Sequence, residues 1–258
     1  MPFRVLILGG TAEGRILSER LASDSRYDAL ISFAGRTERL VRPKEKHRIG
    51  GFGGAEGLAA FLSSSRFQAL VDATHAFAER ISESAAVAAR MTGTPLTRIE
   101  RAPWSMVPGD RWTIVANIDE AAAAIGDAPR RVFLTIGRTS IDAFAIAPQH
   151  RYWIRTVDPI DPPPSLPHAE VITARGPFAL ADEMALLERN RIEIIVSKNS
   201  GTPATYAKIE AARALGIPVV MVQRPMLPEV TQVGDVEGVL RWLEKLRTVV
   251  DSDGARLA

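Results

Sequence analysis

The first twenty residues hold the feature that most constrains how this chain can fold. Residues 5–8 form a short aliphatic run, Val-Leu-Ile-Leu, and the pair Gly9 and Gly10 follows directly. Glycine tolerates positive φ and lets other groups approach the backbone closely. Apolar residues then recur at helical spacing as far as Leu21. This stretch predicts a buried strand, a tight turn and an amphipathic helix.

A strand, a glycine turn and a helix in this order are suited to binding an anion. The glycines let backbone N–H groups approach the ligand, and the helix dipole directs its positive end to the same place. The glycine spacing differs from the G-x-G-x-x-G dinucleotide fingerprint, and a plain βα connection is the alternative. The residues expected to contact a cofactor phosphate are Gly9, Gly10, Thr11, Ala12, Gly14 and Arg15.

Composition excludes several classes of chemistry. The 258 residues include no cysteine and four histidines, which excludes disulfides and cysteine nucleophiles and predicts no metal site. The 32 Lys and Arg residues are spread along the chain, which favours small anionic ligands over nucleic acid. No apolar run approaches the length of a membrane span, and no leader precedes the first strand. We therefore expect a cytoplasmic protein without nucleic-acid or membrane partners.

A basic turn follows the second predicted strand, residues 29–34. At this point of a dinucleotide fold an acidic residue selects NAD, whereas an arginine accommodates the 2′-phosphate of NADP. The turn reads Gly35-Arg36-Thr37, and further basic residues follow it. We expect NADPH as the cofactor, with its 2′-phosphate at this turn. A solvated basic loop is the alternative.

Two further segments of the first half carry candidate ligand contacts. Loop 50–54, Gly-Gly-Phe-Gly-Gly, either contacts a ligand or only turns a short strand into a helix. The strand over 69–75 ends in polar residues, at the edge where open α/β sheets bind ligands. We expect Asp72, Ala73 and Thr74 to contact the cofactor, and His75 is the candidate proton donor. Alternatively, Thr74 caps the helix predicted over 77–91, and His75 binds only backbone at that helix start.

The strand pattern breaks after residue 100, where the chain reads Glu-Arg-Ala-Pro-Trp. We therefore predict two domains, 1–101 and 102–258, each an α/β unit. In the second domain, polar and cationic residues follow several predicted strands, and the Lys198 loop suits a phosphate or carboxylate. A purely structural loop is the alternative. The residues expected to bind an anionic substrate are Thr135, Gly137, Arg138, Arg175, Lys198, Asn199, Ser200, Gly201 and Arg224.

Eight motifs in sequence order resemble those of one family. They read LILGGTAEGR, GGFGG, VDATHAFA, RIERAPW, FLTIGR, ARGPF, SKNSG and VVMVQRP. Together they resemble the precorrin-6A reductase family of cobalamin biosynthesis over residues 4–242. The chain departs from the family pattern at Ala76, since proline is common after the histidine. Proline there only presets the helix start, so we expect the chemistry to survive.

The resemblance implies two Rossmann-like parallel-sheet domains with the active-site cleft between them. It also implies NADPH-dependent reduction of one double bond of a ring-contracted tetrapyrrole. A precorrin carries acetate and propionate carboxylates, so the cations of the second domain are expected to bind these arms. Whether the macrocycle holds cobalt, which carbon receives the hydride and which group supplies the proton stay open. The oligomeric state is also open, and a monomer is compatible with the sequence.

Two other functions are weighed against the reductase. An NADP-binding regulatory module without turnover would share the first domain, but it would not need the cationic loops of the second. A transferase acting on a nucleoside triphosphate would need a phosphate loop of the form G-x-x-x-x-G-K-[ST], which the chain lacks.

Overall fold

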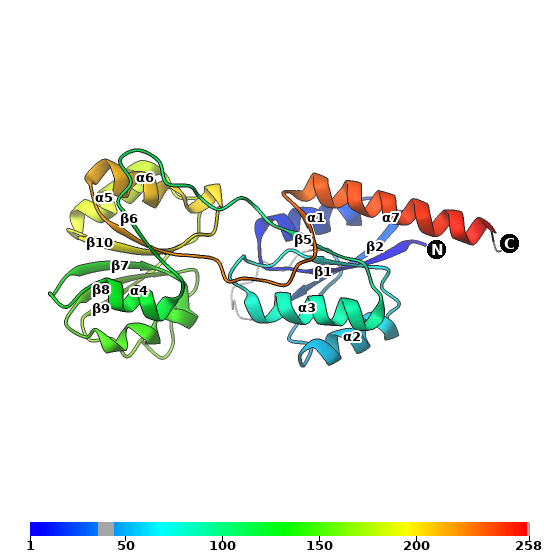
Figure 1. Ribbon diagram of the computed structural model, residues 1–258, viewed down its shortest axis with the longest axis horizontal. Helices are drawn as coiled ribbons and strands as arrows, with labels where there is room; N and C mark the ends of the chain where they lie inside the picture. The colour runs from blue at the N-terminus through cyan, green and yellow to red at the C-terminus, as the bar shows by residue number, and fades with distance from the viewer. Residues whose placement is uncertain (36–43, 257–258) are drawn as a thin grey trace. The chain divides into compact units, whose positions relative to one another are not determined.

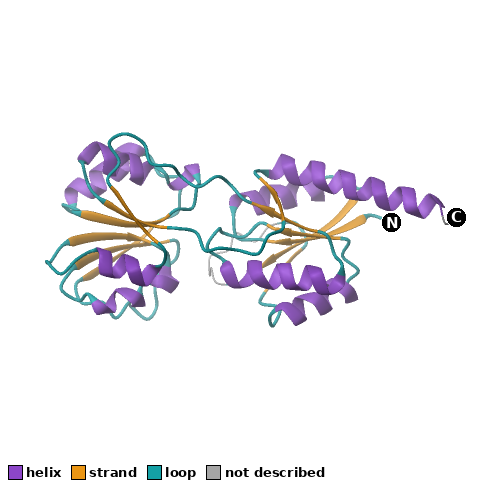
Figure 2. Ribbon diagram, viewed as in Figure 1, coloured by secondary structure: helices purple, strands orange, loops and turns teal. Residues whose placement is uncertain are grey.

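The computed structural model describes residues 1–35 and 44–256, which form two α/β units (Figure 1). Unit 1 contains Met1–Ala102 and Met226–Ala258, and unit 2 contains Pro103–Pro225. Each unit has a six-stranded sheet with helices on both of its faces (Figure 2). All strand pairs among the described residues are parallel. The predicted class, α/β with two parallel Rossmann-like sheets, is confirmed.

The sheet of unit 1 has the strand order β12-β5-β4-β1-β2-β3. This is the 3-2-1-4-5-6 order of the dinucleotide-binding fold, with β12 in the sixth position. The direction of strand addition reverses between β1 and β4, where such folds bind their ligands. The strands are β1 (Phe3–Leu8), β2 (Tyr27–Phe33), β3 (His47–Ile49), β4 (Ala69–Asp72), β5 (Leu96–Ile99) and β12 (Thr231–Val233).

The two faces of the unit 1 sheet are covered by different helices. In Figure 1, α1 (Ala12–Ala22) and α7 (Val236–Arg256) lie on one side of the strands, and α2 (Ala55–Ser64) and α3 (Glu79–Thr92) lie on the other. Successive residues of a strand point to opposite faces. Alternate residues of β1 therefore join two separate cores, Phe3, Val5 and Ile7 with α1 and α7, and Leu6 and Leu8 with α2 and α3.

Unit 2 repeats this architecture, with the strand order β6-β11-β10-β7-β8-β9 and a reversal between β7 and β10. Helices α5 (Leu180–Arg189) and α6 (Ala207–Leu215) cover one face of its sheet, and α4 (Ile118–Ala124) covers the other (Figure 1). Three short 3-10 helices are η1 (Arg138–Ser140), η2 (Asp142–Ile146) and η3 (Pro203–Thr205). The strands are β6 (Trp112–Val115), β7 (Arg131–Thr135), β8 (Arg151–Thr156), β9 (Ala169–Thr173), β10 (Ile194–Lys198) and β11 (Val219–Val222).

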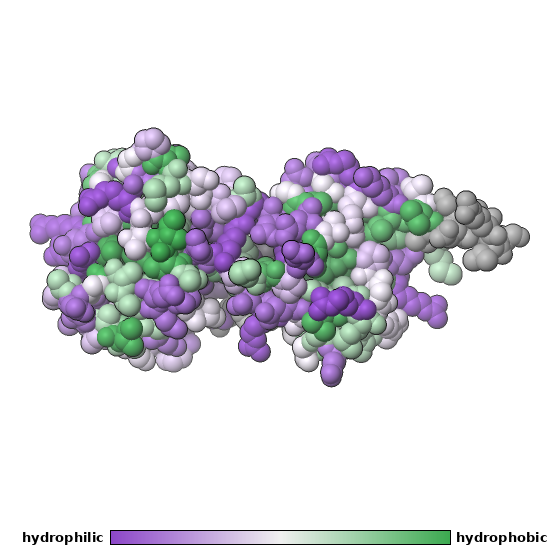
Figure 3. Space-filling model, viewed as in Figure 1, coloured by the Kyte–Doolittle hydropathy of each residue, from purple (hydrophilic) through white to green (hydrophobic). Residues whose placement is uncertain are grey.

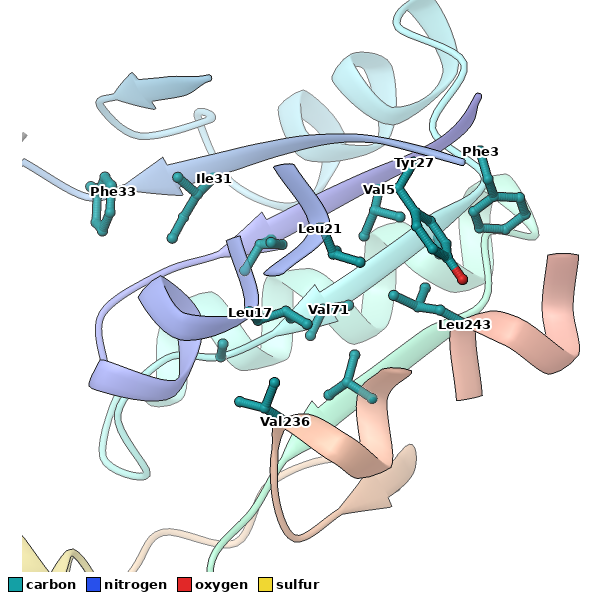
Figure 4. Packing of buried hydrophobic residues seen from close by; sticks show 14 residues of the cluster. Phe3, Val5, Leu17, Leu21, Tyr27, Ile31, Phe33, Val71, Val236 and Leu243 are labelled. Atoms are coloured by element: carbon teal, nitrogen blue, oxygen red, sulfur yellow. The ribbon is translucent and has the colours of Figure 1, made fainter. Parts of the chain in front are cut away.

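The predicted extent of the second domain, 102–258, is wrong at its end. After Pro225 the chain returns to unit 1, where β12 pairs with β5 and α7 covers the core. Val239 and Leu243 of α7 are fully buried, and Figure 4 shows Leu243 near Tyr27. The physical reason is that the apolar side of α7 is covered by the core residues of unit 1.

The sheet of unit 1 thus receives its sixth strand from a distant part of the chain. Strand β6 follows β5 in sequence but joins unit 2, and β12 follows β11 but joins unit 1. Within the described residues, none of the helices combines the length and the apolar character that crossing a bilayer requires. Figure 3 shows hydrophilic residues over much of the visible face, with hydrophobic residues in smaller groups between them.

Candidate functional site

The first candidate site lies at the carboxyl ends of β1 and β4, where the strand order of unit 1 reverses. The Thr11 hydroxyl joins the two loops that leave these strands. It donates to Ala73 O at 2.9 Å and accepts from Gly14 N at 3.3 Å, which makes Thr11 the N-cap of α1. The amino end of α1 is therefore held against the loop that follows β4.

Close approach, and not positive φ, explains Gly9 and Gly14 in this segment. None of Gly9, Gly10 and Gly14 has a positive φ. A Cβ at Gly9 would lie 2.9 Å from Ile31 Cδ1, and a Cβ at Gly14 would lie 3.2 Å from Ala73 Cβ. These two glycines let the turn and α1 pack tightly against the sheet. Gly10 is exposed beside them, as are Ala12 and Arg15 on the first turn of α1.

The Asp72 carboxylate holds the loop after β4 together. It is 1% exposed and accepts from four donors, namely Thr74 N, Thr74 Oγ1, Ser82 Oγ and Arg98 Nε, at 2.7 to 3.1 Å. Arg98 on β5 is itself buried and forms an ion pair with Asp72. Both oxygens of this carboxylate are therefore engaged inside the unit, and its expected contact with a cofactor stays a prediction.

Thr74 and His75 follow Asp72 at the same edge of the sheet. Thr74 does not cap α3, which starts at Glu79 with Ala78 as its N-cap. The His75 ring is exposed, and its Nδ1 accepts from Phe77 N at 3.2 Å. This bond matches the backbone contact weighed as the alternative. It also assigns the proton of the neutral ring to Nε2, since Nδ1 acts as an acceptor.

An ion pair that the sequence analysis missed lies at the start of α1. Glu13 Oε1 and Arg101 Nη1 form a charge-assisted hydrogen bond, and both side chains are 21% exposed. Arg101 follows β5, so the partners are far apart in sequence. The sequence does show an acidic residue in the first turn of this helix, where it interacts favourably with the helix dipole. It gives no local sign that the partner of this residue is an arginine far away in the chain.

The predicted 2′-phosphate contacts Arg36 and Thr37 lie outside the described residues. Gly35, which precedes them, is exposed and has a φ of +72°. A Cβ at Gly35 would lie 3.1 Å from Ile49 Cγ2, so the turn after β2 runs close beside the end of β3.

The second candidate site lies at the carboxyl ends of β7 and β10, where the strand order of unit 2 reverses. Lys198 Nζ at the end of β10 donates to Ser140 Oγ at 2.9 Å in the loop after β7. Burial lowers the pKa of Lys198. Thr135 Oγ1 donates to Val196 O at 3.0 Å, and Gly137 allows the turn after β7 with a φ of +79°. The two loops predicted to bind substrate are therefore adjacent.

Asn199 and Arg224 brace the loop that follows β10. The Asn199 side chain accepts from Trp104 N at 2.7 Å and donates to Trp104 O at 3.0 Å. Arg224 Nε and Nη2 donate to the carbonyl oxygens of Asn199 and Ser200 at 3.0 and 3.1 Å. The Asn199 amide and the Arg224 guanidinium therefore hold backbone in place, and their expected substrate contacts stay predictions.

The remaining predicted substrate residues lie around the same strand ends. Arg138 and Arg175 are exposed after β7 and β9. Ser200 is buried, and Gly201 has a φ of +70°. Among the described residues, no three His, Asp or Glu side chains gather as a metal site.

Comparisons with known proteins agree over both units. The family model described as precorrin-6x reductase CbiJ/CobK matches residues 4–244. A precorrin-6A reductase from Sinorhizobium sp is 55% identical over 93% of this chain and 94% of that protein. One from Rhodococcus erythropolis is 47% identical over 94% and 98%. A solved structure of CobK precorrin-6A reductase matches with a TM-score of 0.89 and 43% identity, over 95% of this chain and 97% of that chain.

Proposed function

This chain belongs to the precorrin-6x reductase family, and we propose that it reduces precorrin-6A in cobalamin biosynthesis with a hydride from NADPH. The observation that carries this proposal is the glycine turn of unit 1. It lies at the reversal of strand order, where a dinucleotide fold binds the pyrophosphate of its cofactor. A family of reductases and a dinucleotide-type turn together support a nicotinamide cofactor.

The residues of this turn fit a pyrophosphate. Gly10 is exposed at the amino end of α1, and Thr11 fixes the direction of that helix. An anion placed there meets backbone N–H groups and the positive end of the dipole. NADPH supplies the hydride, so the protein contributes mainly binding and orientation. Arg36 and Thr37 are the proposed contacts of the 2′-phosphate.

Unit 2 offers cations for the carboxylate arms of the substrate. Arg138 and Arg175 are the exposed arginines after β7 and β9, and Lys198 lies between the loops of β7 and β10. Arginine pairs well with a carboxylate through two parallel hydrogen bonds. Several such pairs would orient the macrocycle through contacts that lie far from the reacting carbon. We propose the metal-free macrocycle as the substrate, since the two relatives from Sinorhizobium sp and Rhodococcus erythropolis carry the name precorrin-6A reductase.

The reduction of a conjugated carbon–nitrogen system also needs a proton, and His75 is the proposed donor. We expect His75→Ala to lower kcat about tenfold, less than a general acid usually contributes, because water can replace it. Steady-state rates across the pH range, with His75→Gln beside His75→Ala, test this role. Turnover that is unchanged at every pH in both variants removes His75 from the mechanism.

The activity itself is tested by following NADPH absorbance with the purified full-length chain. We expect the absorbance to fall only when precorrin-6A is added, and more slowly with NADH. An NADP-binding regulatory module would bind NADPH without this loss. Parallel assays with the cobalt-containing macrocycle test the choice of substrate, and equal kcat/KM for the two macrocycles would contradict it.

A further inference from the structure

Loop 50–54, whose role the sequence leaves undecided, follows β3 at the carboxyl edge of the unit 1 sheet. Phe52 anchors this loop. The centroid of its ring lies 4.0 Å from the guanidinium carbon of Arg48 and 5.4 Å from the ring centroid of Phe61. Its carbonyl oxygen packs against α2 at Gly57, where an added Cβ would overlap with it. The loop is therefore fixed at its centre.

Arg48 binds two successive carbonyl groups of this loop. Its Nη1 donates to Gly50 O at 3.0 Å and to Ser32 Oγ at 2.8 Å, and its Nη2 donates to Gly51 O at 2.9 Å. The peptide bonds Gly50–Gly51 and Gly51–Phe52 are both trans. In a trans peptide the N–H points opposite to the C=O. The N–H groups of Gly51 and Phe52 therefore both point away from the guanidinium.

Two successive N–H groups directed to one side form a nest for an anionic oxygen. Within the described part of the chain, the N–H groups of Gly51 and Phe52 donate to no backbone acceptor. A phosphate oxygen placed there would receive two charge-assisted hydrogen bonds. The loop thus has the chemistry of a small anion site.

Neither backbone conformation nor packing within the described structure requires glycine at position 51. Gly53 and Gly54 have φ values of +80° and +94°, which other residues rarely adopt, but the φ of Gly51 is not positive. A Cβ at Gly51 would meet no heavy atom within 4 Å, and the residue is exposed. Close approach of a ligand to the backbone at this point would explain the glycine.

The position of the loop identifies the ligand group. Gly50 N donates to Phe33 O at 2.9 Å, and Ile49 contacts the turn at Gly35. Loop 50–54 therefore lies beside the end of β2. In a dinucleotide fold this strand end meets the adenosine ribose, which carries the additional phosphate in NADPH.

We propose that the N–H groups of Gly51 and Phe52 bind the 2′-phosphate of NADPH, and that Arg48 is a positioning residue that aims them. This inference rests on the proposed use of NADPH.

The test compares the phosphorylated and unphosphorylated cofactors. Gly51→Ala places a methyl group in the open space beside the N–H groups, without strain in the protein itself. We expect the Kd for NADP⁺, measured by titration calorimetry, to rise about tenfold. The Kd for NAD⁺ should stay within about twofold, because NAD⁺ lacks the phosphate. An equal rise for both cofactors, or no rise for either, overturns the inference.

Arg48 is tested by Arg48→Met and Arg48→Lys, with Arg4→Met as the matched control. Arg4 also stacks on a phenylalanine, Phe67, and binds the Ser65 carbonyl, but it lies at the amino edge of the sheet. We expect both Arg48 variants to raise KM for NADPH about tenfold with kcat unchanged, because an ammonium cannot replace the guanidinium fork. Arg4→Met should lower thermal stability and leave KM unchanged.

Full rescue by Arg48→Lys, or the same KM in folded Arg48→Met as in the wild type, contradicts the positioning role. Failure of the wild type to oxidise NADPH with precorrin-6A contradicts the proposed function instead. The two failures are therefore distinguishable.

Discussion

Asp72, Asn199 and Arg224 show that a polar residue at a strand end can hold either a loop or a ligand. Asp72 ends its strand and the other two follow theirs, all at the ligand-binding edge of a sheet, and all three bind neighbouring protein groups. Residue type and position are the same in both roles. Only the partners of the side chain distinguish them, and those partners come from distant parts of the chain.

Asp72→Asn tests the bracing role of this carboxylate. The change leaves the buried Arg98 guanidinium without its counter-charge. Removing one partner of a buried ion pair is strongly destabilising, because the other charge stays buried and uncompensated. We expect a loss of about 3 kcal/mol in the free energy of unfolding, measured by urea denaturation. Ser82→Ala, which removes one neutral donor to the same carboxylate, should cost about 1 kcal/mol. Equal losses for the two variants would contradict the importance of the charge.

Lys208 predicts a dependence of stability on pH. It is buried, its Nζ donates to Thr205 O at 2.7 Å, and Arg155 and Glu183 are its charged neighbours. Burial chiefly lowers the pKa of Lys208 to about 7, with Arg155 acting in the same direction and Glu183 against it. Between this pKa and the unfolded value of 10.5, the unfolded chain binds more protons. The contribution of Lys208 to stability therefore rises with pH in this window.

Lys208→Met removes this dependence. Relative to the variant, the wild type should gain on the order of 3 kcal/mol of unfolding free energy between about pH 7 and pH 10. Urea denaturation at a series of pH values measures the difference. Parallel curves for the two proteins would show that Lys208 does not change its charge on unfolding in this range.

At the scale of elements, apolar periodicity predicts most of the helices and strands, but it does not give the bounds of β3 and it misses β12. Strands β3 and β12 have three residues each, too few for a periodic pattern. The strand predicted over 69–75 ends at Asp72, because Asp72 and Thr74 form a local turn through their side chains.

The contact between α2 and loop 50–54 gives a prediction at this scale. A Cβ at Gly57 would overlap with Phe52 O, so Gly57→Ala must displace the loop or the helix. We expect a loss of about 2 kcal/mol in unfolding free energy, since this overlap outweighs the gain in helix propensity. Gly234→Ala is the control, because a Cβ there meets nothing within 4 Å. Thermal denaturation of both variants measures the effect, and equal midpoints would contradict the contact.

At the scale of the whole molecule, the return of the chain to unit 1 links the folding of this unit to residues 226–256. Strand β12 and helix α7 complete unit 1, whereas residues 103–225 contain every strand of unit 2. Burial of Val236, Val239 and Leu243 contributes about 2 kcal/mol each. This sum is comparable with the total stability of a domain.

Fragments of the chain test this dependence. We expect residues 103–225 to fold alone, with dispersed amide signals in NMR spectra and a cooperative thermal transition. Residues 1–102 should remain unfolded alone and should fold when 226–258 are joined to them by a flexible linker. Cooperative folding of 1–102 by itself would show that α7 is dispensable for unit 1.

The amino-acid sequence by itself determined the α/β class, the parallel strands and the two loops at strand ends where ligands are proposed to bind. These properties follow from local patterns, namely aliphatic runs, helical periodicity and glycine turns. Only the tertiary structure decided that residues 226–256 belong to unit 1 and that Asp72, Asn199 and Arg224 brace loops. It also oriented the two N–H groups of loop 50–54. These properties depend on contacts between residues far apart in the chain, which no local pattern specifies.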